Sequence, residues 1–117
     1  MPDKDAAYLW DMLETARRLQ RFAERNDQQD FGEGTMPRLA LERLFEILGV
    51  AAMRVSEEVR AAHPAIPWQR IVGLRNVIAH EYDEIIFDRL WEVLTQDVPQ
   101  LIRLLEPLIP PPPEEPG

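Results

Sequence analysis

Apolar side chains recur at helical spacing along most of the chain, and polar or proline-containing segments separate the periodic stretches. The first stretch follows Asp3 and Asp5, either of which could cap a helix that runs to about Arg25. The polar residues 26–34 then predict a loop. After it, Thr35-Met36-Pro37 predicts a helix start, because threonine can cap the helix and proline needs no amide donor there.

The apolar stripe of this second helix extends from Leu41 to Val59, long enough to pair with the first helix along most of its length. Gly49 falls inside it, which costs local stability and indicates a close helix crossing. The prolines in 63–68 end the helix, and Pro67 can itself begin a third helix, which carries residues 74–82.

A last helical region follows Asp83, with apolar positions from Phe87 to Leu108 and an interruption expected near Asp97-Val98-Pro99. No stretch of the sequence alternates with the period of a strand. The pattern therefore predicts an all-α fold, an antiparallel bundle of four to five helices over residues 1–106. The proline-rich, acidic segment 107–117 is predicted to be an extended, mobile tail.

Composition limits the chemistry that this domain can use. A net charge of −8 argues against non-specific coating of nucleic acid, so any RNA site must be local. Arg17, Arg18, Arg21 and Arg25 form either a solvated helix face or an RNA track. With no cysteine and two histidines, we expect no disulfide, no metal site and no cofactor. The polar N-terminus and the lack of a long apolar run predict a cytoplasmic protein without a membrane segment.

The third predicted helix carries an arginine where apolar residues are expected. On a helical wheel, Arg75 falls in the middle of an arc of apolar side chains that includes Ile71 and Leu74. An unpaired charge there is costly, so the arginine needs a partner, a wet cleft or another subunit. The opposite side of the wheel is polar and gathers Gln69, Asn76, His80 and Asp83.

Arg75 and His80 do not point toward one ligand from an ideal helix, because five positions turn the helix by about 140°. A two-fold axis beside the third helix would bring a second copy of both residues to the same groove. The spacing thus favours a site in a dimer cleft. Tyr82, seven positions after Arg75, shares its stripe and lies at the margin of this region.

Three segments together carry a family resemblance: Ile47-Leu48-Gly49, then His63-Pro64-x-Ile66-Pro67-Trp68, then Gly73-Leu74-Arg75-Asn76-x-x-x-His80-x-Tyr82. The pattern resembles the HepT-like branch of the HEPN superfamily from Tyr8 to about Leu105. The resemblance implies a dimeric helical bundle, and many such proteins are endoribonuclease toxins. The chain departs from the common pattern at Val50, where an acidic residue is expected after the glycine.

The resemblance also implies roles for the residues of the third segment. It makes Arg75 and His80 catalytic, with Asn76 and Asp83 in support, in a metal-independent cleavage that leaves a 2′,3′-cyclic phosphate. Tyr82 becomes the residue to which a nucleotidyltransferase antitoxin of the MntA type attaches AMP. The implied partners are thus an RNA substrate, a second copy of the chain and that antitoxin.

Two other interpretations remain open at this point. In the first, the chain is a catalytically inactive HEPN subunit that mainly partners a minimal nucleotidyltransferase. In the second, it is a structural helical dimer in which Arg75 and Tyr82 make a buried polar contact. Retention of the whole Arg-Asn-x-x-x-His-x-Tyr set favours the enzyme over the inactive subunit.

Overall fold

The computed structural model describes residues 3–79 and 84–109, and every regular element within these ranges is helical. The predicted all-α class is confirmed. None of the described helices is both long and apolar enough to cross a membrane. The helices are α1 (Asp3–Arg25), α2 (Met36–Arg54), α3 (Glu57–Ala62), α4 (Trp68–Ala79), α5 (Glu84–Glu92) and α6 (Val98–Leu105).

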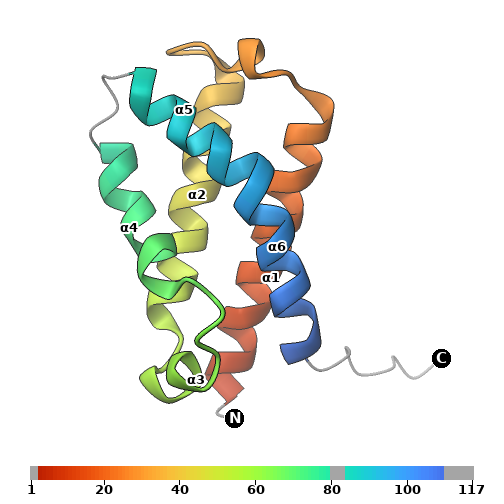
Figure 1. Ribbon diagram of the computed structural model, residues 1–117, viewed down its shortest axis with the longest axis vertical. Helices are drawn as coiled ribbons and strands as arrows, with labels where there is room; N and C mark the ends of the chain where they lie inside the picture. The colour runs from red at the N-terminus through yellow and green to blue at the C-terminus, as the bar shows by residue number, and fades with distance from the viewer. Residues whose placement is uncertain (1–2, 80–83, 110–117) are drawn as a thin grey trace, which may run out of the picture.

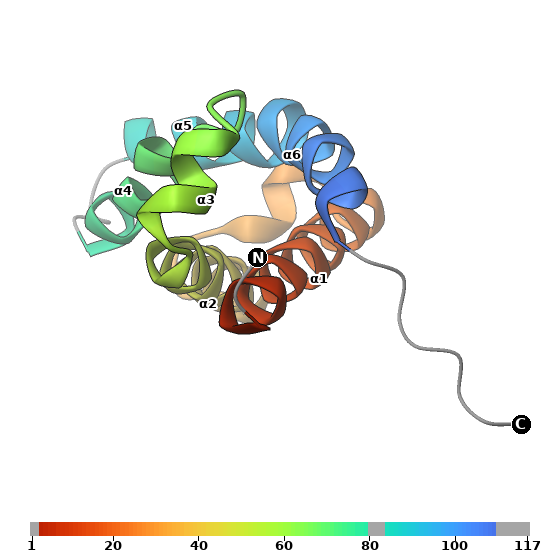
Figure 2. The same cartoon turned by 90° about the horizontal axis from the view of Figure 1, so that it is seen from below.

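The long helices form a bundle with one lightly packed side. Helix α1 packs against α2 and α6, and α2 also packs against α4 (Figures 1 and 2). A π-helical turn, Val93–Asp97, joins α5 to α6 in one rod over residues 84–105. The bundle therefore has four long members and the short α3, which agrees with the predicted four to five helices. Its fourth side lies between α4 and the rod.

The core is built from the apolar stripes that the sequence pattern predicts. Leucines from α1, α2, α5, α6 and the π turn are fully buried, and burying each contributes about 2 kcal/mol relative to exposure. This burial outweighs the modest helix propensities of the individual segments. The largest fully buried side chains are Phe31, Phe45, Leu9, Met12, Leu19, Leu41, Leu48, Leu90, Leu94, Leu105, Val55 and Val98.

The expected second helix, with its stripe to Val59, is in fact two helices. Helix α2 ends at Arg54, and Ser56 caps α3 by accepting a hydrogen bond from the Val59 amide at 3.3 Å. Of the two expected caps of the first helix, Asp3 and Asp5, Asp5 is not a cap. Asp5 lies inside α1, is buried, and accepts bonds of 2.8 Å from both the amide and the hydroxyl of Ser56. This long-range contact stops the helix, and local periodicity cannot reveal it.

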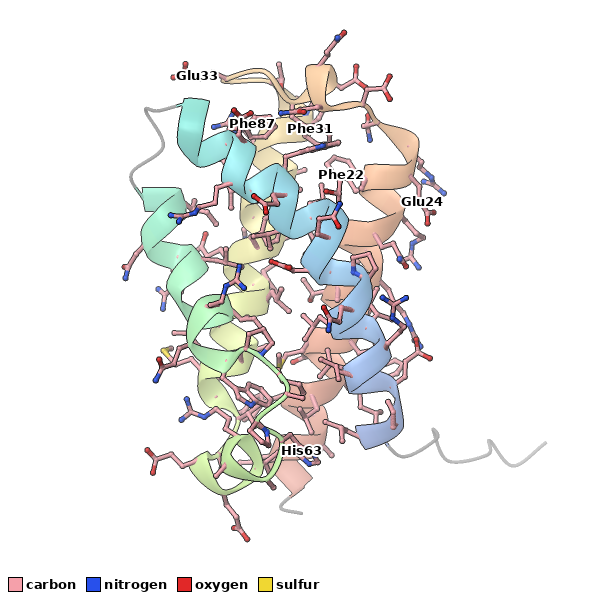
Figure 3. All side chains as sticks on the ribbon, viewed as in Figure 1. Phe22, Glu24, Phe31, Glu33, His63 and Phe87 are labelled. Atoms are coloured by element: carbon pink, nitrogen blue, oxygen red, sulfur yellow. The ribbon has the colours of Figure 1, made fainter. Side chains whose placement is uncertain are left out.

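The predicted loop 26–34 contains a 3-10 turn, Gln28–Phe31, that belongs to the core. Phe31 is 1% exposed and packs edge to face against Phe22, with ring centroids 5.3 Å apart (Figure 3). A single apolar residue among polar neighbours has no periodicity, so the pattern could not predict its burial.

A buried arginine ties this end of α2 to α5. The Arg38 Nε donates to a Glu42 carboxylate oxygen at 2.9 Å, and both side chains are almost fully buried. The Arg38 guanidinium also lies 4.1 Å from the centre of the Phe87 ring. Phe87 is on the first turn of α5, so this contact fixes the start of the rod against α2.

The predicted interruption of the last helical region appears as a π turn rather than a break. Pro99 has no amide hydrogen to donate to the carbonyl of Thr95, and the Val98 amide instead bonds to the Val93 carbonyl. The packed part continues past residue 106, where the domain was expected to end. Leu108 and Ile109 pack against the core after a 3-10 turn, Glu106–Leu108. Residues 110–117 lie outside the described residues.

Candidate functional site

The candidate residues divide between helix α4 and the segment that follows it. Arg75 and Asn76 lie on α4 and are described. The other three candidates, His80, Tyr82 and Asp83, lie outside the described residues, between the end of α4 at Ala79 and the start of α5. The described part of the site therefore consists of Arg75, Asn76 and their surroundings on α4.

Helix α4 buries one side and exposes the other, as predicted, but Arg75 is not on the buried side. Trp68, Ile71 and Leu74 are buried, whereas Asn76 and Arg75 are exposed. Arg75, which the wheel places among apolar side chains, is thus exposed. The alternatives for this charge were a partner, a wet cleft or another subunit. In the single chain the side chain is in contact with solvent. The alternative of a buried contact between Arg75 and Tyr82 falls on a residue outside the described ones.

Gly49 explains how an arginine can sit next to the apolar face of α4. A Cβ atom on Gly49 would lie 3.2 Å from Cγ of Arg75 and 3.2 Å from the carbonyl oxygen of Ile71. The backbones of α2 and α4 thus approach closely here, which confirms the predicted crossing. The aliphatic stem of Arg75 lies across the glycine, and the charged end reaches the surface.

The exposed arginine borders an open hollow of about 540 Å³ between α2 and α4. Among the side chains that the structure describes, no carboxylate lies within 4.0 Å of the Arg75 guanidinium. An exposed guanidinium can donate two parallel hydrogen bonds to the oxygens of a ligand phosphate. The residues that line the hollow are Glu46, Val72, Arg75, Asn76 and Ile78.

Beside the hollow, the solvent side of α2 carries a stripe with heptad spacing, which we call the α2 stripe. Met36 is 77%, Leu39 50% and Met53 47% exposed, a large apolar exposure for one helix face. Successive members of the stripe are alternately three and four residues apart, which is the spacing found where two helices pack in a coiled coil. The hydrophobic periodicity of α2 predicted only its core-facing stripe, so this second stripe was not predicted. The members of the α2 stripe are Met36, Leu39, Arg43, Glu46, Val50 and Met53.

Two members of the α2 stripe carry opposite charges at its centre. Arg43 and Glu46 form an exposed ion pair at 3.4 Å, and Glu46 also lines the Arg75 hollow. Val50, where an acidic residue was expected, is half-buried on the same stripe. The stripe and the hollow are therefore one continuous surface.

His63 does not belong to this surface. It caps the C-terminal end of α3. Its carbonyl oxygen accepts a 3.0 Å hydrogen bond from the indole of Trp68, the first residue of α4. In Figure 3 it lies at the end of the bundle opposite Phe87. In the part of the chain that the structure describes, no three His, Asp or Glu side chains gather in a way that could hold a metal ion.

The sequence matches a family described as "Ribonuclease HepT-like" over residues 12–108. A protein of Methanocaldococcus jannaschii named "Putative RNase MJ1380" is 35% identical over 86% of this chain and 92% of its own length. Another from that organism, "Putative RNase MJ1216", is 26% identical over 93% of this chain and 91% of its own. "Probable ribonuclease HepT" of Thermococcus cleftensis is 28% identical over 80% of this chain and 86% of its own length. No solved structure matches the chain.

Proposed function

Since the chain belongs to the HepT-like ribonuclease family, we propose that it is a metal-independent endoribonuclease toxin of a type VII, HepT/MntA toxin–antitoxin system. The observation that carries the proposal is an exposed Arg75 guanidinium on an open hollow. His80 follows Arg75 by five positions in the sequence. The proposed phosphate-binding cation and the proposed proton-transfer group are thus close together along the chain.

In the proposed reaction, Arg75 binds the scissile phosphate and stabilises the negative charge that builds up on it. A base removes the proton of the ribose 2′-hydroxyl, and the 2′-oxygen forms a new bond to phosphorus. The bond from phosphorus to the 5′-oxygen breaks, and an acid protonates the leaving oxygen. His80 supplies proton transfer near neutral pH, with Asn76 and Asp83 in support. The products are a 2′,3′-cyclic phosphate and a 5′-hydroxyl.

The proposal includes a homodimer joined along the α2 stripe. A second copy would cover the exposed Met36, Leu39 and Met53, which otherwise face water. In an antiparallel pairing about a two-fold axis, Arg43 of each copy can meet Glu46 of the other. The hollow adjoins this stripe through Glu46, so the same axis would bring two Arg75 side chains to one groove.

The proposal also includes control by a nucleotidyltransferase antitoxin that transfers AMP from ATP to the Tyr82 hydroxyl, with release of pyrophosphate. An attached AMP adds a bulky anion close in sequence to Arg75, where it competes with the RNA phosphate. Co-expression with the cognate nucleotidyltransferase should add the mass of AMP to the chain. The added mass should be absent in Tyr82→Phe.

RNA cleavage by the purified protein in EDTA tests the nuclease directly. We expect His80→Ala and Arg75→Ala to reduce the rate by about 100-fold or more while the fold is kept. Arg70→Ala is the matched control, because Arg70 lies on the same helix, is 73% exposed and does not line the Arg75 hollow.

End-group analysis of the cut RNA should find a 5′-hydroxyl, and a 5′-phosphate would contradict the proposed reaction. Equal behaviour of wild type and His80→Ala would instead support the inactive partner subunit.

A further inference from the structure

A second pocket lies on the other side of α4 from Arg75, on the lightly packed side of the bundle. Its volume is about 320 Å³, at the lower end of the range for small-molecule sites. Leu48 of α2, Leu74 of α4 and Leu90 of α5 contribute to an apolar lining. Because its walls come from α4 and the rod 84–105, we call it the α4–rod pocket. It shares no lining residue with the Arg75 hollow.

Gly73 keeps this pocket open. It lines the pocket, and a Cβ atom placed on it would meet nothing within 4 Å. A glycine in the middle of a helix costs about 1 kcal/mol relative to alanine. Here no close packing demands that cost, in contrast to Gly49. The space beside Gly73 is therefore large enough for a ligand group.

The wall opposite Gly73 includes the π turn. Val93 and Asp97, the first and last residues of that turn, both line the pocket. A π turn widens the helix and is found frequently at functional sites. Pro99 explains how the turn arises, and the wider turn forms part of the pocket wall.

Charges at the pocket rim favour an anion. Arg70 is already paired with Asp97 at 3.3 Å across the pocket mouth, so these two charges balance. Arg89 also lines the pocket, is exposed, and has no carboxylate within 4.0 Å among the side chains that the structure describes. Among these side chains, Arg89 is thus a cation without a carboxylate partner at the edge of the apolar interior.

We propose that the α4–rod pocket binds a small amphipathic anion, an aliphatic carboxylate whose chain fills the space beside Gly73 and whose carboxylate pairs with Arg89. Apolar burial supplies most of the affinity, and the ion pair sets the orientation of the ligand. A bound ligand would contact both α4 and the rod, the two elements that the segment 80–83 connects. The binding does not depend on the proposed nuclease activity.

Isothermal titration of the purified full chain with octanoate and with octanol tests this inference. We expect octanoate to bind once per chain with a Kd of about 0.1–1 mM. Octanol should bind about fivefold more weakly, because it lacks the charge that Arg89 recognises. Arg89→Gln should weaken octanoate about fivefold and leave octanol unchanged. Arg103→Gln is the matched control, because Arg103 is exposed on α6 and does not line the pocket.

Gly73→Leu should fill the pocket and abolish binding of both compounds, with circular dichroism confirming the helical fold. Should this variant fail to fold, Gly73→Ala should still weaken both compounds, since its methyl group occupies part of the same space. Absence of octanoate binding to the wild type overturns the proposal. Equal affinity for octanoate and octanol, or unchanged binding in a folded Gly73 variant, overturns it as well.

Discussion

At the scale of single residues, two glycines show how the same residue type serves opposite purposes. Gly49 lets α2 and α4 approach until a Cβ would come within 3.2 Å of the Ile71 carbonyl oxygen. Gly73 faces open space on the other side of α4. One glycine permits a backbone crossing that positions Arg75, and the other leaves a pocket.

Alanine at each glycine should therefore have effects of opposite sign on stability. Gly73→Ala should raise the free energy of unfolding by about 1 kcal/mol through helix propensity alone. Gly49→Ala gains the same propensity but crowds a backbone carbonyl, so we expect a net loss of about 1 kcal/mol. Urea unfolding of the two variants measures the difference. A stabilised Gly49→Ala would show that the crossing tolerates a side chain.

A residue-scale prediction also follows from the buried Arg38–Glu42 pair. Arg38→Leu leaves the Glu42 carboxylate buried without its partner, so the free energy of unfolding should fall by about 3 kcal/mol. Replacing both residues by leucine should recover most of this loss, because no unpaired charge remains. Urea unfolding of the single and double variants tests the coupling. Additive losses would mean that the pair does not act as a unit.

At the scale of elements, long-range hydrogen bonds decide where one helix becomes two. The apolar stripe continues from α2 into α3, yet the chain turns at Val55 and Ser56. Asp5 of α1 binds both donor groups of Ser56 at this turn. The start of α3 is therefore attached to α1 as well as capped by its own serine.

Removal of the Asp5 carboxylate should loosen α3 before the rest of the bundle. Asp5→Ala leaves the Ser56 amide and hydroxyl without their acceptor, and we expect a loss of about 2 kcal/mol. Hydrogen exchange should accelerate in α3 more than in α1. Asp11→Ala is the matched control, because Asp11 is an exposed carboxylate on the same helix. Equal effects of the two variants would contradict the role assigned to Asp5.

At the scale of the whole molecule, two faces of the bundle are left uncovered by the helices that the structure describes. One is the α2 stripe with the Arg75 hollow, and the other is the α4–rod pocket. They lie on different sides of α4, so a single helix presents both. The proposed dimer uses the first face and leaves the second accessible to small molecules.

A charge placed on the α2 stripe should separate the proposed dimer without unfolding the chain. Leu39→Glu and Met53→Glu put carboxylates at half-exposed positions that a second copy would bury. Sedimentation should give a dimer for the wild type and a monomer for the double variant, with unchanged circular dichroism. Trp10→Glu is the control, because Trp10 is also 42% exposed but lies on α1. A monomeric wild type would contradict the dimer.

Periodicity, capping residues and prolines were enough to predict the helical class, the end of α1 and the starts of α2 and α4. These features depend on contacts within a few residues, which the order of side chains along the chain encodes directly. The family was also recognisable in the sequence, because its motif is a short linear pattern around Arg75 and His80. The close crossing at Gly49 could be inferred too, since a glycine inside a stable helix needs a reason.

Only the tertiary structure decided the features that depend on distant residues. The bonds from Asp5 to Ser56 divide a helix, Phe31 completes the core from within a polar segment, and Arg75 is exposed despite its apolar wheel position. Each outcome depends on which helix lies opposite, and a wheel or a stripe describes one helix at a time. The physical reason is that burial and hydrogen bonding are properties of pairs of surfaces, and the fold alone brings those surfaces together.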